Sequence, residues 1–277
     1  MIFLMEYMCL KSTLSSTFLL KNNISLVFFK YLCYNKTCQL NYIGVDMAND
    51  IFRRVEKKYL LTRDDYESLM DRIWFYITED TYFKSNISNI YYDSCDNELI
   101  INSIDKPVFK EKVRVRSYVT PKNDNDEVFL EIKRKFKGVV GKRRVKLTLK
   151  EFYDFVENRK YKDSQIFREL HYIFDFYKLQ PMMFVGYDRL SYKGKDDENL
   201  RITFDSNLRS REDDLRLELG DHGEKYFDED MYIMEIKTLG AMPWWLVEAL
   251  SELKIYPISF SKIGNIYCKK LEVENVK

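Results

Sequence analysis

Residues 111–119 read EKVRVRSYV, and this short stretch decides how the chain folds. Val113 and Val115 alternate with Arg114 and Arg116. A period of two is typical of a β-strand with one apolar and one polar face. Taken alone, the pattern predicts a surface strand whose valines face the core and whose arginines face water.

The same two-faced pattern recurs along the chain. In YIMEIKTL, residues 232–239, Met234 and Ile236 alternate with Glu235 and Lys237. The charged faces together carry eleven bases and four acids, a surplus of seven positive charges: Arg54, Lys58, Arg114, Arg116, Lys133, Lys135, Arg144, Lys146, Arg189, Arg201 and Lys237 against Glu56, Glu131, Asp205 and Glu235. Ordinary surface strands carry bases to block edge pairing. Recurrence on six or seven strands favours a shared functional surface instead.

The overall composition hides this surplus. The chain has 277 residues, 45 Lys plus Arg and 44 Asp plus Glu, for a net charge of +1. It therefore has no general attraction to nucleic acid or to an anionic membrane. With 2 histidines, a three-histidine metal site is excluded, and the 5 cysteines lack zinc-like spacing. Five reduced thiols indicate a cytoplasmic protein.

Two regions differ in composition. Residues 1–46 contain only Glu6 and Asp46 as acids, and their apolar stretch is shorter than the roughly 20 residues that span a bilayer. We expect residues 1–46 to be a poorly structured extension and 47–277 to be a single domain, with the natural start at Met47. The alternative for the extension is a loose membrane-contacting arm.

Strands and helices interleave after Met47. Helices are predicted at 63–77, 149–157, 163–179 and 243–253, with Thr148 and Glu151 forming a capping box. The predicted strands are 51–60, 89–94, 111–120, 127–136, 143–149, 183–192, 200–205 and 231–239, with a short one near 215–219. About eight mostly antiparallel strands predict an α+β fold with a barrel or a strongly bent sheet.

A closed sheet would place its charged face inside, because the helices must cover the apolar face. Seven uncompensated charges in a partly dehydrated interior require a counter-anion that is large and multiply charged. A chain of phosphates fits, since Arg and Lys both bind phosphate oxygens. The acids in the same register would hold a divalent metal that bridges those oxygens.

The ordered motifs resemble a known family. FRRVEKKYLL, VRVRSY, FLEIKRK, GKRRVKL, VGYDRLSY, LRITFDSNL, YIMEIKTLG and ISFSKIGNIY are similar in spacing to the VTC domain. This domain is the polyphosphate polymerase branch of the triphosphate tunnel metalloenzymes, the CYTH-like superfamily. The resemblance covers about residues 50–270. It implies an eight-stranded antiparallel tunnel barrel with a polar, basic interior and helices packed outside.

The resemblance also implies an activity and its residues. The activity would be transfer of the ATP γ-phosphate onto a growing polyphosphate chain, with Mn²⁺ or Mg²⁺ as cofactor. The implied catalytic residues are Lys58, Arg114, Arg116, Lys133, Arg189, Arg201 and Glu235. Glu235 would bind the metal, and Glu56 and Glu131 are two further candidate ligands. Phosphate-binding candidates are Arg54, Lys135, Arg144, Lys146, Lys237, Ser261 and Lys262.

Phosphoryl transfer needs positioning and charge neutralisation more than covalent catalysis, so the lack of a Ser-His or Cys-His pair is no obstacle. Hydrolytic members of the superfamily open with E-x-E-x-K, whereas this chain has Arg54, Glu56 and Lys58. The arginine favours polymerisation, and a tunnel hydrolase of inorganic or nucleoside triphosphates is the alternative. The family's membrane helices are not visible, so coupling to transport would require a separate membrane-protein partner.

The third functional hypothesis is a nucleic-acid-binding module. Residues 133–146 hold eight bases and no acid, which could track a phosphate backbone. Against it, Glu56, Glu131 and Glu235 lie in register among the bases. We also expect no aromatic stacking platform on the charged face.

Overall fold

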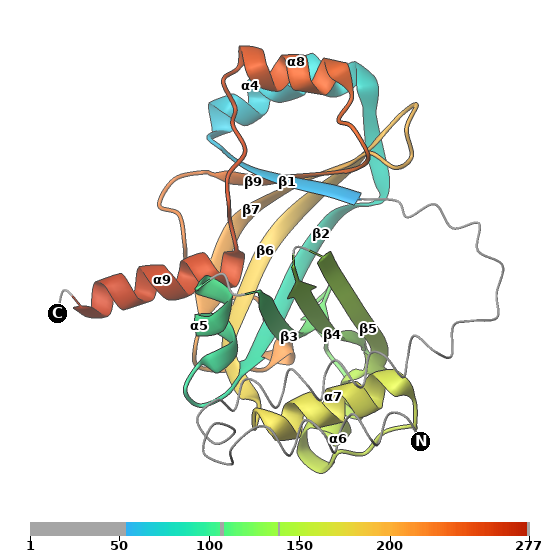
Figure 1. Cartoon of the computed structure of the whole chain (residues 1–277), viewed down its shortest axis with the longest axis vertical. Helices are drawn as coiled ribbons and strands as arrows, with labels where there is room; N and C mark the ends of the chain where they lie inside the picture. Colours follow the sequence, from blue (N-terminus) through green and yellow to red (C-terminus); the bar gives the residue numbers. More distant parts are fainter. Residues whose placement is uncertain (1–53, 106–107, 138, 276–277) are drawn as a thin grey trace, which may run out of the picture. The chain divides into compact units, whose positions relative to one another are not determined.

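The computed structural model describes residues 54–105, 108–137 and 139–275 (Figure 1). The predicted extension 1–46 lies outside these residues, so the domain boundary stays a prediction. The strands are β1 (Arg54–Leu61), β2 (Ile77–Asp93), β3 (Phe109–Ser117), β4 (Glu127–Phe136), β5 (Val139–Thr148), β6 (Gln180–Gly194), β7 (Arg201–Arg211), β8 (Glu224–Lys225) and β9 (Tyr232–Leu239). The helices are α4 (Arg63–Ile73), α5 (Glu98–Ile104), α6 (Leu149–Asn158), α7 (Gln165–Phe176), α8 (Trp244–Glu252) and α9 (Lys262–Asn275), with 3₁₀ turns η1 (Trp74–Tyr76) and η2 (Leu217–Leu219).

The strands form one antiparallel sheet in the order β1-β9-β7-β6-β2-β3-β4-β5, and the short β8 pairs with β7. The α+β class and the eight-strand antiparallel path are confirmed. The sheet bends strongly between β6 and β3 (Figure 1). Within the described residues no pairing joins the end strands β1 and β5, so hydrogen bonds do not close the barrel.

The apolar face of the sheet is covered by helices in two places. Near β3 and β4, α6 and α7 contribute Phe152, Phe155 and Phe174, each at most 1% exposed. Near β9 and β7, α4 and α8 contribute Leu69 and Leu246, both 0% exposed. Burying such a side chain stabilises the fold by about 1.5–3 kcal/mol. The helices therefore fix which face of the sheet is left for other uses.

A third apolar cluster lies on the charged face itself, at one end. Ile263 and Ile266 of α9, together with Phe260 just before the helix, pack against Val185 and Tyr187 of β6. The expectation that all helices pack outside is thus wrong for α9. Its first turn fills one end of the inner face and leaves the charged residues in the remainder.

Local sequence explains most element boundaries. Capping boxes begin α4 at Thr62 with Asp65 and α6 at Thr148 with Glu151, and the second of these was predicted. The predicted strand near 215–219 is the turn η2 instead. β2 is far longer than the predicted 89–94, because a register shift between Glu79 and Lys84 interrupts its alternation. The short helix α5 and the helix α9 were not predicted.

No helix in the described ranges combines the length and the apolar character that a membrane crossing requires.

Candidate functional site

The inner face of the sheet brings charged side chains together by register. Opposite Glu235 of β9 lie Lys58 of β1 and Thr203 of β7, and opposite Lys237 lies Glu56. Farther along the face, three more pairs are directly opposite each other: Arg189 and Asp205, Asn89 and Arg116, Arg114 and Glu131. The alternation seen in the sequence therefore puts these residues on a single surface.

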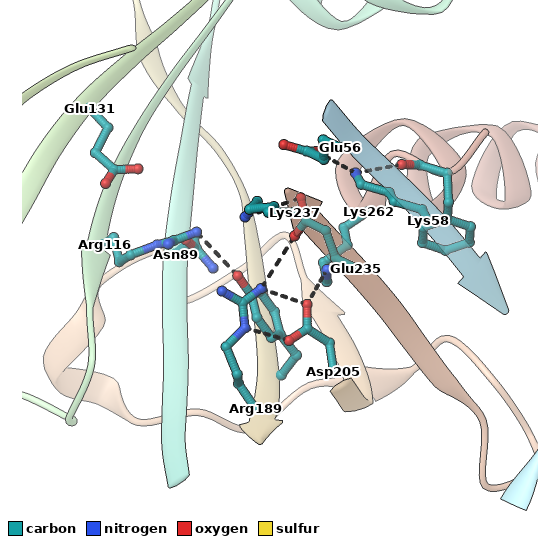
Figure 2. Close-up of polar contacts among 12 residues, drawn as sticks. Glu56, Lys58, Asn89, Arg116, Glu131, Arg189, Asp205, Glu235, Lys237 and Lys262 are labelled. Carbon is teal, nitrogen blue, oxygen red and sulfur yellow. Dashed lines mark hydrogen bonds and ion pairs between the residues drawn. The ribbon is translucent and has the colours of Figure 1, made fainter. Parts of the chain in front are cut away.

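Glu235 is one of the acids near which cations of this surface gather (Figure 2). Its Oε1 lies 3.3 Å from Lys237 Nζ and its Oε2 lies 3.9 Å from Arg189 Nη2. Burial raises the pKa of Glu235, but the hydrogen bond from Glu56 and the charges of Lys237, Lys58 and Arg189 outweigh it and lower the pKa below its ordinary value. Glu235 is therefore an anion held ready for a cation.

Glu56 is the second carboxyl group at this place. Burial raises the pKa of Glu56, and the nearby Glu235 raises it further. Two carboxylates so close cannot both be ionised unless a cation lies between them. A divalent ion is such a cation, and the pair therefore fits the predicted metal.

The described residues contain no group of three or more His, Cys, Asp or Glu side chains that could hold a metal. Mg²⁺ is commonly held by one or two carboxylates, with waters and substrate phosphates completing its coordination. Glu56 and Glu235 match that arrangement. Thr203, across from Glu235, has a buried Oγ1 without a hydrogen-bond partner, which marks a polar position that a bound group would satisfy.

The third predicted metal ligand, Glu131, does not join this pair. Its Oε2 accepts a hydrogen bond of 2.8 Å from Arg114 Nε, and its Oε1 lies 2.8 Å from both Lys142 Nζ and Arg144 Nε. Burial raises the pKa of Glu131, but Arg114, Arg116 and Lys142 outweigh it and lower the pKa to about 2. With its oxygens committed to three cations, Glu131 neutralises bases, and the geometry argues against a metal-binding role.

Asp205 organises the cations at the α9 end of the site (Figure 2). It is 1% exposed and accepts two hydrogen bonds from Arg189, of 2.6 Å from Nε and 2.8 Å from Nη2. It accepts a third, of 2.6 Å, from Lys262 Nζ. The sequence placed Asp205 on the charged face, but its contact with Lys262, 57 residues away, depends on α9 lying on the inner face.

The remaining predicted site residues divide between the interior and the rim. Lys58 donates a hydrogen bond of 2.9 Å to the carbonyl oxygen of Phe260. The Ser261 hydroxyl accepts a hydrogen bond of 2.8 Å from Lys112 Nζ. Three predicted bases are more exposed and pair outside the centre: Arg144 with Glu131 and Tyr118, Lys146 with Glu127, and Arg201 with Asp80. Lys133 and Lys135 are exposed on β4. The side chain of Arg54 lies outside the described residues.

Lys112 is a site residue that was not predicted from the sequence. It occupies the same face of β3 as Arg114 and lies opposite Lys133. Burial lowers the pKa of Lys112 to about 8, and the charges of Lys110, Lys133 and Lys58 add to this lowering, while Tyr91 opposes it. Extending the alternation of VRVR by one step would have found this base.

The expectation of no aromatic stacking platform concerned the charged face, and aromatic rings do lie there. Tyr91, Tyr118, Phe129 and Tyr187 all lie on it by register or contact. Arginines cover these rings: the guanidinium carbon of Arg144, for example, is 3.9 Å from the centre of the Phe129 ring. These aromatic rings therefore position arginines, so they are not open platforms for stacking bases.

Anion binding should weaken as pH rises through 8. Lys112, whose pKa is about 8, then loses its positive charge. Tyr91 gains a negative charge over the same range, because its pKa is also about 8. Burial raises the pKa of Tyr91, but the charges of Arg114, Lys112 and Arg116 outweigh burial and lower it. We expect affinity for inorganic triphosphate, measured by calorimetry without metal, to fall about tenfold between pH 7 and 9, the effect of losing one charge-assisted contact. The triphosphate also titrates, but it does so equally with every variant. A smaller pH dependence of triphosphate affinity in Lys112→Met than in the wild type would therefore come from Lys112, and this is the result we expect. An equal dependence in that variant would contradict this assignment.

Comparisons with known proteins were made for sequence and for structure. The model of the VTC domain matches residues 53–271. A search of curated protein sequences gives no match. Among solved structures, the chain is similar to a "putative adenylate cyclase" from Bacillus halodurans, with 13% identity, 75% of this chain and 93% of that chain covered, and a TM-score of 0.48. It is also similar to the PH1819 protein from Pyrococcus horikoshii, with 18% identity, coverage of 78% and 99%, and a TM-score of 0.41.

Proposed function

The chain belongs to the VTC domain family, and from this premise we propose that it is a polyphosphate polymerase that transfers the γ-phosphate of ATP onto a growing phosphate chain. The inner face of the sheet carries the proposal: cations from several strands surround one pair of carboxyl groups. This arrangement suits a substrate with many negative charges and a bridging metal.

The residues of the inner face would have different roles according to their position. Glu235 and Glu56 would hold Mn²⁺ or Mg²⁺, which supplies charge neutralisation at the phosphate oxygens when it is bound. Arg114, Arg116 and Arg189 provide guanidinium groups that can grip phosphate in pairs of hydrogen bonds. Lys58, Lys112, Lys237 and Lys262 supply point charges around them.

The acceptor in such a reaction needs little activation. The terminal phosphate of a polyphosphate chain is already anionic, so a strong general base is unnecessary. Besides the carboxyl pair, the inner face carries the buried acids Asp205 and Glu131, and each of these two is bound to several cations. The site is therefore better suited to hold two phosphate groups in line than to activate water.

The second candidate is a tunnel hydrolase of inorganic or nucleoside triphosphates. The observation that favours it is Glu56, which lies beside Glu235 and could orient a water molecule as well as a metal. In this reaction water replaces the acceptor phosphate and the same cations bind the triphosphate.

One assay separates the two functions. The purified chain is incubated with ATP and Mn²⁺, its products are run on a polyphosphate-stained gel, and ADP and free phosphate are measured. We expect a ladder of chains with ADP in excess over free phosphate. Free phosphate in step with ADP and no ladder would show the hydrolase, and a chain that released neither product would contradict both candidates.

A further inference from the structure

Each of the three least exposed arginines described on the inner face, Arg114, Arg116 and Arg189, is held along one edge of its guanidinium group. A guanidinium has an edge formed by Nε and one Nη, and a second edge formed by the two Nη atoms. The three contacts, from Nε to a side-chain oxygen, are Arg114 to Glu131 at 2.8 Å, Arg116 to Asn89 at 2.8 Å and Arg189 to Asp205 at 2.6 Å. In all three, the protein acceptor takes up the Nε edge.

The three acceptors share two further properties. They are buried, with Asn89 at 0%, Glu131 at 2% and Asp205 at 1% exposed. Each also lies directly opposite its arginine on the neighbouring strand. Strand register and a hydrogen bond therefore set the direction in which each arginine points before any ligand binds.

Asn89 is the acceptor that carries no charge. Its Nδ2 donates to the carbonyl oxygen of Val185 at 2.8 Å, which turns its Oδ1 toward Arg116 (Figure 2). Among the described residues no carboxylate lies within ion-pair distance of Arg116; its Nη2 donates to the Tyr187 hydroxyl at 3.1 Å, and its guanidinium carbon is 5.9 Å from the centre of the Tyr118 ring. Arg116 is thus oriented by a neutral side chain, whereas Arg114 and Arg189 are oriented by carboxylates.

We propose that Asn89 and Asp205 are positioning residues: they hold the Nε edges of Arg116 and Arg189 and thereby present these arginines to phosphate groups. Glu131 does the same for Arg114. The proposal rests on the proposed function for the nature of the anion. Asn89 differs from the other two because it orients its arginine without a charge of its own, so Arg116 is the one of these three arginines for which the described residues show no ion pair.

A double-mutant cycle tests the proposal with inorganic triphosphate as the probe. Its affinity for the full chain is measured by calorimetry without metal, which makes the result independent of turnover. Asn89→Ala should weaken binding about tenfold or more, the usual effect of removing a partner that orients a binding group. In an Arg116→Ala background, Asn89→Ala should lower triphosphate affinity by less than about threefold. The arginine that Asn89 orients is then already absent, and the effects of contacting residues are coupled. Equal losses in both backgrounds would mean a purely structural role and overturn the proposal.

Asn86 supplies the matched control. It lies on the same strand but on the opposite face, and its Nδ2 donates to Asp188 and Asp221. Asn86→Ala should leave triphosphate affinity unchanged. If Asn89→Ala does not fold, Asp205→Asn in wild-type and Arg189→Ala backgrounds gives a second cycle with a nearly isosteric change, and additive losses there overturn the proposal equally. A wild-type chain that fails to bind triphosphate would contradict the proposed function as well.

Discussion

Arg116→Ala should abolish phosphate transfer and leave the protein at least as stable as the wild type. The side chain is 6% exposed, and its partners Asn89 and Tyr187 are neutral. Removing one preorganised donor from a charge-stabilising set costs about 10²–10³-fold in kcat. Removing a cation that has no ion-pair partner among the described residues relieves repulsion from the neighbouring cations, which offsets the lost packing.

Two measurements check this expectation: kcat in the polymerase assay and the midpoint of thermal unfolding. Arg114→Ala is the matched comparison, because Arg114 is paired with the buried Glu131, so its removal should lower the melting temperature as well as the activity. A large loss of stability in Arg116→Ala with activity retained would show that Arg116 is a structural residue.

Glu235→Gln should remove metal-dependent activity while leaving metal-free anion binding equal or tighter. Glu235 is 9% exposed, and its carboxylate oxygens lie 3.3 Å from Lys237 and 3.9 Å from Arg189. The amide keeps the shape but loses the charge that a divalent ion requires, and we expect a loss of activity of at least about 10²-fold. The same change removes one negative charge from a cationic surface, which favours a bound triphosphate.

This role requires a loss of activity without a loss of metal-free triphosphate affinity. Activity is followed across a Mn²⁺ titration, and triphosphate affinity is measured by calorimetry in the presence of a chelator. Glu248→Gln, on the exposed part of α8, is the control for loss of a surface carboxylate and should change neither. Parallel losses of activity and metal-free affinity would indicate a general disruption of the site.

The composition of the charged face could be predicted from sequence because alternation is local. In a strand, residues two apart share a face, so Arg114 and Arg116 were placed together without knowledge of any partner strand. The same rule placed Glu56 beside Lys58 and led to the family resemblance. It failed for the first half of β2, where a register shift breaks the period.

Contacts between distant segments required the tertiary structure. Glu131 was a candidate metal ligand because it shares a face with the bases, but register brings it to Arg114 and Arg144, away from Glu235. Asn89 could not be identified, since an amide within an apolar and aromatic strand has no distinguishing pattern. Its role depends on lying opposite Arg116.

The sequence by itself therefore determined which side chains of each strand share the charged face, because that depends on a period of two residues. Only the tertiary structure decided which acid neutralises which base and where α9 lies. Lys58 meets the carbonyl oxygen of Phe260, 202 residues away, and Asp205 meets Lys262 because α9 packs its apolar side chains onto the inner face. Such pairings are set by the packing of whole elements, which the local pattern of residues does not encode.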